Sequence, residues 1–217
     1  MADRVPLDFD PPVRQLRALL LGVSAEDLSA ATPCPDWTVG ALLDHIIGLS
    51  WAFAQAARKG TDAPGGSTPP PEPSAANLPP HWRSRLPAML EDLVTAWKDP
   101  VSWTGTARAG GVTMPAAEMG MVAVNEIVMH GWDLAQATGQ EFAVDPRILE
   151  TLIEFLSRGP AEGTPGMFGP VVPLTGEAAL LDQALALAGR DPSWRRSRRQ
   201  AVPRPRTSTD RTRPART

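Results

Sequence analysis

The sequence predicts an all-α protein built as a four-helix bundle, with short extra helices and at most one small hairpin. Four long segments repeat apolar residues at helical spacing, prolines and glycines separate them, and the alternating patterns typical of strands are almost absent. A length of 217 residues with 42% hydrophobic residues is sufficient for one core of ordinary size. Helices that each carry one apolar stripe bury it most simply against one another, which favours a bundle.

The first helical pattern opens at prolines 11–12 and continues to Val23. Residues 31–37 are too rich in proline to be helical, because each ring removes an N–H donor and fixes φ. Thr38 is the expected N-cap of a second helix over residues 39–58. The buried stripe of that helix is expected to contain Leu42, Ile46, Leu49 and Phe53.

Residues 60–80 combine many prolines with few apolar side chains, and we expect a flexible loop there. A third helix follows, in which Pro87 has to lie in the first turn or bend the helix. Its apolar stripe is expected to be Leu86, Leu90, Leu93 and Trp97. Residues 100–114 are rich in turn formers and are compatible with a short hairpin.

Pro115 suits the first position of a long fourth helix, which Gly139 is expected to stop. Two shorter helices are expected over residues 146–157 and 177–188, the second stopped by Gly189. No internal repeat is visible, so these segments are expected to form one domain.

The charge of the chain divides that domain, residues 1–194, from a tail over residues 195–217. The tail carries nine arginines and one aspartate, so the remaining residues carry a formal net charge of −11 against −3 for the whole chain. The tail's composition predicts disorder. The acidic body argues against nucleic acid as a partner of the folded domain. The tail could contact nucleic acid or acidic lipid through charge alone, or could simply be solubilising.

The sequence favours a cytoplasmic location. It has no basic start followed by an apolar run, no stretch near 18 uninterrupted apolar residues, and only one cysteine, Cys34. These features indicate neither a secretory signal, a membrane span nor an intrachain disulfide.

The fourth helix carries the first candidate for chemistry. It is apolar almost all the way round except at Glu126 and His130, which are four residues apart and therefore lie on one face, one turn apart. A carboxylate in such surroundings is costly unless it is paired or bound to a metal. The two residues could chelate one ion, or they could form a buried hydrogen bond with only a structural purpose.

His45 strengthens the metal interpretation, because it falls on the inward stripe of the second helix. Two of the three histidines therefore lie on buried helix faces, and with Glu126 they give two imidazoles and one carboxylate. Three protein ligands with an open position are typical of a catalytic metal site. The third histidine, His81, lies at a loop-to-helix junction and is interpreted as an ordinary surface residue.

Three motifs make the sequence similar to a known family. Residues 32–37 (TPCPDW), 43–46 (LDHI) and 125–135 (NEIVMHGWDLA) resemble the metal-binding domain of mycothiol-dependent maleylpyruvate isomerases, a group within the DinB-like superfamily of four-helix bundles. Residues 168–170 (FGP) and 189–192 (GRDP) resemble short actinobacterial members. Together the motifs are fairly specific for the family and much less specific for a reaction.

The resemblance implies that His45, Glu126 and His130 bind one divalent metal. It also implies mycothiol as a cosubstrate, whose thiol would ionise at the metal and attack a small electrophile in a transfer or an isomerisation. The family's isomerase would carry a further C-terminal domain, for which this chain is expected to be too short. No catalytic or thiol-binding residue and no oligomeric state is assigned.

Three choices stay open. Zinc is the default metal, although two imidazoles and a carboxylate also accept nickel, iron or cobalt. The alternative function is a non-catalytic metal-binding module with a structural or sensory metal. A non-haem iron oxygenase is ranked last, because the helical context does not favour it.

Other polar or aromatic residues near these motifs have two interpretations each. Cys34 is a fourth ligand or a reactive thiol, or else a small residue that packs a tight turn. Asp36 and Trp37 are expected to cap and anchor the second helix. Asp133 could fix the tautomer of His130 or form an ion pair between helices, and Trp132 is expected in the core.

Overall fold

The computed structural model describes residues 7–35, 37–60, 72–164 and 167–196. The helices in these residues are α1 Asp10–Leu21, α2 Val39–Ala57, α3 Trp82–Trp97, α4 Ala116–Thr138, α5 Pro146–Leu156 and α6 Leu180–Leu187. Three short 3-10 segments are η1 Glu26–Ser29, η2 Ala75–Asn77 and η3 Pro100–Trp103. The strands β1 Thr106–Ala109 and β2 Val112–Pro115 form one antiparallel hairpin.

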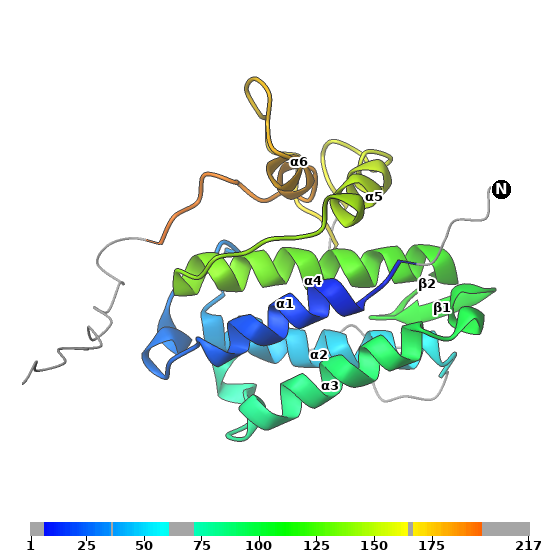
Figure 1. Cartoon of the computed structure of the whole chain (residues 1–217), viewed down its shortest axis with the longest axis horizontal. Helices are drawn as coiled ribbons and strands as arrows, with labels where there is room; N and C mark the ends of the chain where they lie inside the picture. Colours follow the sequence, from blue (N-terminus) through cyan, green and yellow to red (C-terminus); the bar gives the residue numbers. More distant parts are fainter. Residues whose placement is uncertain (1–6, 36, 61–71, 165–166, 197–217) are drawn as a thin grey trace, which may run out of the picture.

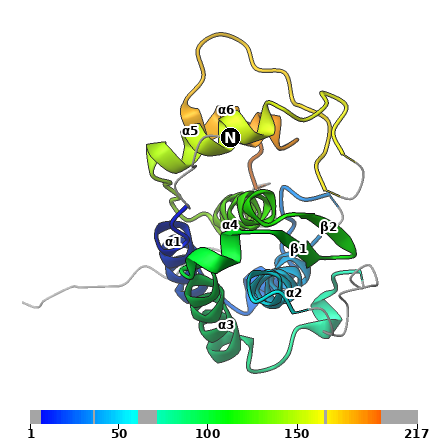
Figure 2. The same ribbon diagram turned by 90° about the vertical axis from the view of Figure 1, so that its right-hand side faces the viewer.

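Helices α1 to α4 form a bundle, which confirms the all-α expectation. Helix α2 contacts α3 and α4, and α1 contacts the same two helices from the other side. Figure 1 shows these four helices running side by side, and Figure 2 shows α5 and α6 as a further layer on the far side of α4. Helix α4 is therefore covered from both directions, by the bundle and by the C-terminal segment.

Helix α4 is buried almost around its whole circumference, as its sequence predicts. Burying one large aliphatic side chain contributes about 1.5–3 kcal/mol, so an apolar helix is most stable in this central position. Its glycines allow close packing. A Cβ at Gly120 would meet the ring of Trp103 at 2.5 Å, and one at Gly131 would meet Phe142 at 2.8 Å.

The helix ends mostly follow the local sequence signals. The Oγ1 atom of Thr38 accepts a hydrogen bond from the Ala41 N–H and caps α2, and Gly139 ends α4 with a φ of 65°. Pro115 is the N-cap residue of α4 and not its first helical residue. Helix α6 starts three residues later than expected, because Ala179 is extended, with a ψ of 152°.

The expected hairpin is present between η3 and α4. Gly110 and Gly111 join its strands with φ values of 57° and 82°. Two successive positive φ angles are what the favoured two-residue hairpin turn requires, and glycine adopts them without a Cβ penalty. Pro87 lies in the second turn of α3, inside the helix, so the first-turn alternative is wrong.

Parts of the loop and tail expectations concern residues outside those described. Residues 61–71 of the expected loop and 197–217 of the tail fall there. Within the described part of the loop, the segment η2 packs against α2, where Ser74 N donates to Asp44 Oδ2 at 3.1 Å. Helix α2 is long and apolar enough to cross a membrane, but 61% of its most apolar window is buried in the protein, as in the core helix of a bundle.

Candidate metal centre

The contact between α2 and α4 brings His45, Glu126 and His130 together. The Oε2 atom of Glu126 lies 3.0 Å from Nε2 of His130 and 3.9 Å from Nε2 of His45. One donor atom from each residue lies within 4.8 Å of the others. The predicted set therefore converges on one point, although its residues come from two helices that lie far apart in the sequence.

The geometry and chemistry of these three donors fit a divalent metal. Metal–ligand bonds of about 2.0–2.1 Å in a tetrahedral site place neighbouring ligand atoms about 3.3 Å apart, close to the two distances observed. Two imidazoles and one carboxylate leave one position for an exchangeable ligand. The side chain of His130 is 4% exposed, whereas those of Glu126 and His45 are 16% and 19% exposed. Solvent therefore reaches the donor set from the side of His45 and Glu126.

Asp133 holds the opposite edge of the His130 imidazole. Its Oδ2 lies 3.0 Å from Nδ1 of His130, and the carboxylate is fully buried. A carboxylate only accepts hydrogen bonds, so Nδ1 of His130 carries a proton that it donates to Asp133. On the other edge of the ring, Nε2 faces Glu126 and the donor set, where a metal would take the place of its proton. This contact is the one expected if Asp133 fixes the tautomer of His130, the first of its two interpretations.

Arg190 also contacts Asp133, a contact that was not predicted. Its Nη2 lies 3.4 Å from Asp133 Oδ2 and 3.7 Å from the Sγ of Cys34. Arg190 belongs to the segment after α6, so this ion pair joins the C-terminal layer to α4. In the sequence, the GRDP motif of residues 189–192 supports only the family resemblance. A buried acid that needs a cation was the signal available in the sequence, but it does not identify which of many arginines supplies the cation.

Close contacts between the backbones of three glycines position Arg190. Gly189 has a φ of 78°, and a Cβ there would lie 2.7 Å from the Cα of Gly169. Gly163, with a φ of 81°, approaches the backbone of Gly169 in the same way. These close approaches require glycine and fix the path of the chain immediately before Arg190.

Cys34 lies on the Asp133 side of His130, away from the donor set. Its Sγ donates to Asp133 Oδ2 at 3.1 Å and lies 4.0 Å from Nδ1 of His130. Cys34, His130 and Asp133 are also close enough to hold an ion. The guanidinium of Arg190 beside both Cys34 and Asp133 already supplies a positive charge there, which disfavours a second cation. Cys34 is half-buried, and its Sγ does not belong to the donor set of His45, Glu126 and His130, so it is not placed as a fourth ligand there.

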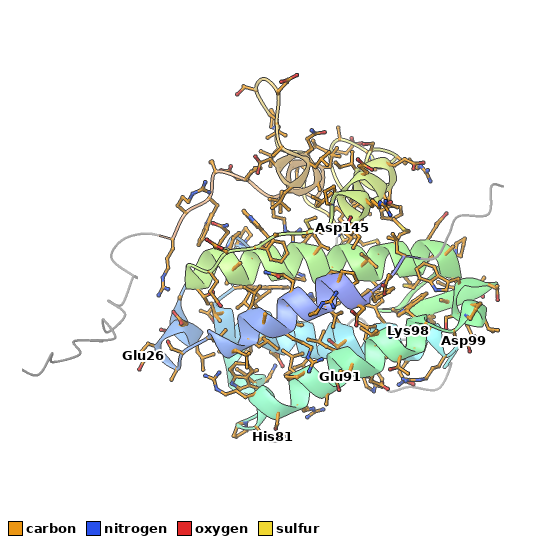
Figure 3. The ribbon with its side chains drawn as sticks, in the orientation of Figure 1. Glu26, His81, Glu91, Lys98, Asp99 and Asp145 are labelled. Atoms are coloured by element: carbon orange, nitrogen blue, oxygen red, sulfur yellow. The ribbon has the colours of Figure 1, made fainter. Side chains whose placement is uncertain are left out.

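Three aromatic rings meet at the site. The Trp37 ring centroid lies 4.6 Å from that of His45 and 5.9 Å from that of His130, and the two imidazoles lie 4.9 Å apart at 85°. Trp37 therefore contacts the ligands as well as leading into α2. Asp36, its neighbour, is outside the described residues. Trp132 is buried in the core as expected, and His81 is exposed at the start of α3 (Figure 3).

The charges of the site compensate one another. Burial raises the pKa of Glu126, but hydrogen bonds from His130 and His45 outweigh it and hold this pKa well below its usual range. Burial lowers the pKa of His130, but Asp133, Cys34 and Glu126 raise it well above its usual range. Burial dominates at His45 and lowers its pKa. For Asp133, burial raises the pKa, while His130 and Arg190 lower it further than burial raises it.

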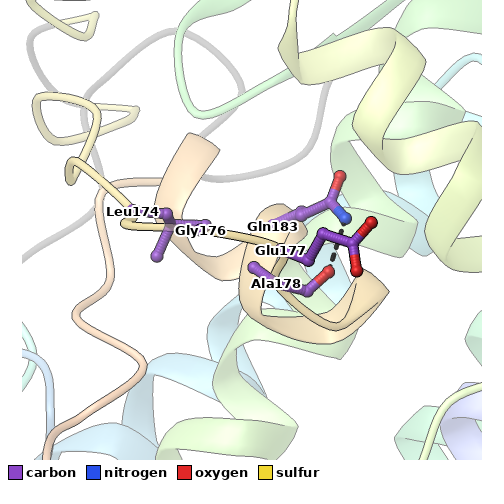
Figure 4. Close-up of a pocket in the computed structure, with 5 residues that line it drawn as sticks. All are labelled: Leu174, Gly176, Glu177, Ala178 and Gln183. Carbon is purple, nitrogen blue, oxygen red and sulfur yellow. Dashed lines mark hydrogen bonds between the residues drawn. The ribbon is translucent and has the colours of Figure 1, made fainter.

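Two surface pockets lie away from these residues. One, of about 530 Å³, is lined by Leu174, Gly176, Glu177, Ala178 and Gln183 of the C-terminal segment (Figure 4). A smaller one, of about 200 Å³, is lined by Leu7, Asp8, Phe9, Val94, Trp97 and Lys98. None of the three candidate metal-binding residues lines either pocket. A small molecule would therefore have to reach the donor set where His45 and Glu126 are partly exposed.

Comparison with known families matches the region that holds the site. The family model described as the mycothiol maleylpyruvate isomerase N-terminal domain matches residues 9–135, which include all three candidate ligands. Uncharacterized proteins from two strains of Mycobacterium tuberculosis are each 28% identical over 179 residues, covering 80% of this chain and 90% of the relative.

Solved structures agree on the fold. The crystal structures of the mycothiol-dependent maleylpyruvate isomerase and of one of its mutants match with a TM-score of 0.61 at 21% identity, covering 90% of this chain and 92% of that chain. A match of this extent continues well past residue 135 into the segment of α5 and α6. The expectation that this chain is too short for the C-terminal part of that isomerase is therefore wrong.

Proposed function

Since the chain belongs to the mycothiol maleylpyruvate isomerase N-terminal domain family, with its DinB-like bundle, we propose that it is a thiol-dependent isomerase or transferase. It binds one divalent metal through His45, Glu126 and His130 and acts on small electrophiles. The observation that carries the proposal is the convergence of these three donor atoms, within 4.8 Å, from two helices.

Each residue of the site has a separate task in this proposal. His45, Glu126 and His130 hold the ion, and Asp133 keeps the Nδ1 proton of His130 in place so that Nε2 is free to coordinate. Arg190 balances the buried charge of Asp133. Apolar residues of α2 and α4 pack around the buried His130 and keep bulk water from that side of the site, which strengthens the charge interactions there.

The bound ion supplies Lewis-acid chemistry: it lowers the pKa of a thiol at its open position and thereby generates a nucleophile at neutral pH. A thiolate formed in this way would add to one carbon of an activated double bond in the substrate, and the π electrons of that bond would move onto the activating group. Protonation of the adduct would complete a transfer, whereas rotation about the former double bond followed by expulsion of the thiolate would complete an isomerisation. Family membership supports mycothiol as the thiol, and zinc is the metal we expect.

The wider setting is part of the same proposal. A small-molecule thiol and an electrophile are the partners, and the site lies in the cytoplasm, where such a thiol is kept reduced. Residues 1–194 form the catalytic domain and residues 195–217 an appended basic tail. The acidic domain is not expected to bind nucleic acid.

Elemental analysis of the purified protein and of the His45→Ala variant tests the proposal. We expect about one equivalent of metal in the wild type and little in the variant, followed by product formation that depends on both metal and mycothiol. Equal metal in both proteins would remove His45 from the site. One equivalent of metal with no activity toward any pair of thiol and electrophile would support the non-catalytic module instead.

A further inference from the structure

The two histidines of the site are held in different ways. The outer nitrogen of His130, Nδ1, lies 3.0 Å from the buried carboxylate of Asp133. His45 has no such partner: within residues 7–35, 37–60, 72–164 and 167–196, its only polar contact is from Nε2 to Glu126, at 3.9 Å. That contact lies on the side of the donor set, and no residue that the structure describes forms a hydrogen bond with the opposite edge of the imidazole.

This difference is consequential for a metal ligand. A ligating histidine usually donates its second N–H to a carboxylate, a carbonyl or water, which fixes the ring orientation. Without such a contact, the imidazole of His45 could rotate about its last side-chain bond, and metal binding would have to order it at an entropic cost. Some other contact has to fix the ring if the donor set is to be preorganised.

The indole of Trp37 makes that contact. Its centroid lies 4.6 Å from that of His45 at an interplanar angle of 56°, within the range of favourable aromatic pairs. The same indole lies 5.9 Å from His130 at 30°. One side chain therefore packs against both imidazoles. For His45, it adds a ring contact to the one with His130, whose centroid lies 4.9 Å away at 85°.

Trp37 is itself firmly placed. Its carbonyl accepts hydrogen bonds from Thr32 Oγ1 at 3.0 Å and from Thr32 N at 3.2 Å, while its own N–H donates to the Cys34 carbonyl at 3.3 Å. The ends of this turn pair as a bridge between Ala31 and Thr38, and α2 begins at the next residue. The proline-rich turn thus fixes the backbone of Trp37 relative to the helix that carries His45.

We propose that Trp37 is a positioning residue of the metal site. Its indole fixes the His45 imidazole, whose outer edge no described residue holds by a hydrogen bond, and orients Nε2 toward Glu126. The part of this proposal that concerns metal affinity rests on the proposed function. The part that concerns the His45 ring holds without a metal. The two parts can therefore be tested separately.

The variants Trp37→Phe and Trp37→Leu separate an aromatic contact from simple bulk. In the metal-free protein, the ring current of Trp37 is expected to displace the imidazole proton resonances of His45, and Trp37→Leu to abolish this displacement. The protein has only three histidines, so comparison with His45→Ala assigns the resonance. Far-UV circular dichroism establishes that each variant is folded.

Metal affinity, measured by chelator competition with Co²⁺ and Zn²⁺, is the second measurement. We expect Trp37→Leu to weaken binding by about 10–100-fold, the usual effect of losing an outer contact to a ligand. Trp37→Phe keeps an aromatic face and should stay within about threefold of the wild type. The Co²⁺ absorption spectrum should change in Trp37→Leu, because a misoriented imidazole alters the coordination geometry.

Several results would overturn the proposal. They are a folded Trp37→Leu protein with unchanged metal affinity, an unchanged His45 resonance, or equal losses in the Phe and Leu variants. Asp36→Asn is the control for the neighbouring residue. A larger loss of metal affinity in Asp36→Asn than in Trp37→Leu would indicate that the Asp36 carboxylate, and not the Trp37 indole, positions His45. A wild type that binds no metal but shows the His45 displacement would refute the proposed function and leave the ring contact standing.

Discussion

The buried carboxylate of Asp133 lies 3.0 Å from Nδ1 of His130, three residues earlier on the same helix, and 3.4 Å from the guanidinium of Arg190, 57 residues later. This one side chain therefore links a candidate metal ligand to the C-terminal layer. Its pairing with His130 follows from helix geometry, and its pairing with Arg190 does not. Both contacts have measurable consequences.

Replacing Asp133 by asparagine should weaken both the metal site and the fold. The amide carries no charge, so Arg190 and His130 lose their buried counter-ion, a loss that typically costs about 3–5 kcal/mol of stability. Metal affinity should fall by about 10–100-fold, because Nδ1 of His130 is no longer held by a carboxylate. Urea unfolding and chelator competition measure the two effects.

The control for this prediction is Asp92→Asn. Asp92 pairs with Arg58 at 2.6 Å on the surface, where an ion pair contributes about 0–1 kcal/mol. If Asp92→Asn destabilised the protein as much as Asp133→Asn, the central importance assigned to the buried pair would be wrong.

Metal affinity should fall as the pH is lowered from 8 to 6. Asp133, Cys34 and Glu126 outweigh burial and raise the pKa of His130, so this imidazole holds a second proton that coordination has to displace. The pKa of His45 is lowered, so His45 is already neutral in this range. Each displaced proton weakens binding by about tenfold per pH unit below the pKa.

Isothermal titration with Zn²⁺ in buffers of different ionisation enthalpy counts the protons released. An affinity that does not change between pH 6 and pH 8 would contradict the assignment of imidazole ligands. The Glu126 carboxylate does not produce this dependence, because its pKa lies well below the range tested.

Gly189→Ala should destabilise the protein, whereas Gly48→Ala should not. Gly189 has a φ of 78°, and its new Cβ would meet the backbone of Gly169 at 2.7 Å. The left-handed conformation alone costs a non-glycine residue about 1–2 kcal/mol, and the clash adds to it. Gly48 lies inside α2 with no atom within 4 Å of its added Cβ, so alanine should gain about 0.5–1 kcal/mol there.

Thermal unfolding of both variants checks the contrast. Gly189→Ala should also weaken metal binding, since a displaced Arg190 leaves Asp133 without its cation. Wild-type stability in Gly189→Ala would show that the close approach of Gly189 to Gly169 is not needed to place Arg190 beside Asp133.

Asn125→Leu should raise stability. Asn125 is fully buried, and neither polar atom of its amide has a hydrogen-bond partner among the residues that the structure describes. An unsatisfied buried polar group costs about 1–3 kcal/mol, and an apolar side chain of similar size removes that cost. An increase in the urea midpoint without a change in slope is the expected result. A loss of stability would mean that a buried water molecule satisfies the amide.

Local features of the fold were predictable from the sequence because they depend on neighbours within a turn or two. The apolar period of 3.6 residues predicted the bundle helices, and Thr38 and Gly139 marked two of their ends. The turn formers of residues 100–114 were compatible with the hairpin that the structure contains. Weak signals gave errors of the same local kind. Pro87 lies inside α3 and not in its first turn, which was one of the two placements expected, and α6 begins at Leu180.

Some features of the candidate site were likewise predictable from local sequence, and others depended on tertiary packing. The sequence by itself determined that Glu126, His130 and Asp133 share one face of α4, because residues three, four and seven apart on a helix are neighbours. It also placed His45 on an inward stripe. Only the tertiary structure decided that α2 meets α4 where His45 faces Glu126, that Trp37 lies against both imidazoles, and that Arg190 reaches Asp133. Those contacts depend on how helices and loops pack, which side chains far apart in the chain determine jointly and no local pattern records.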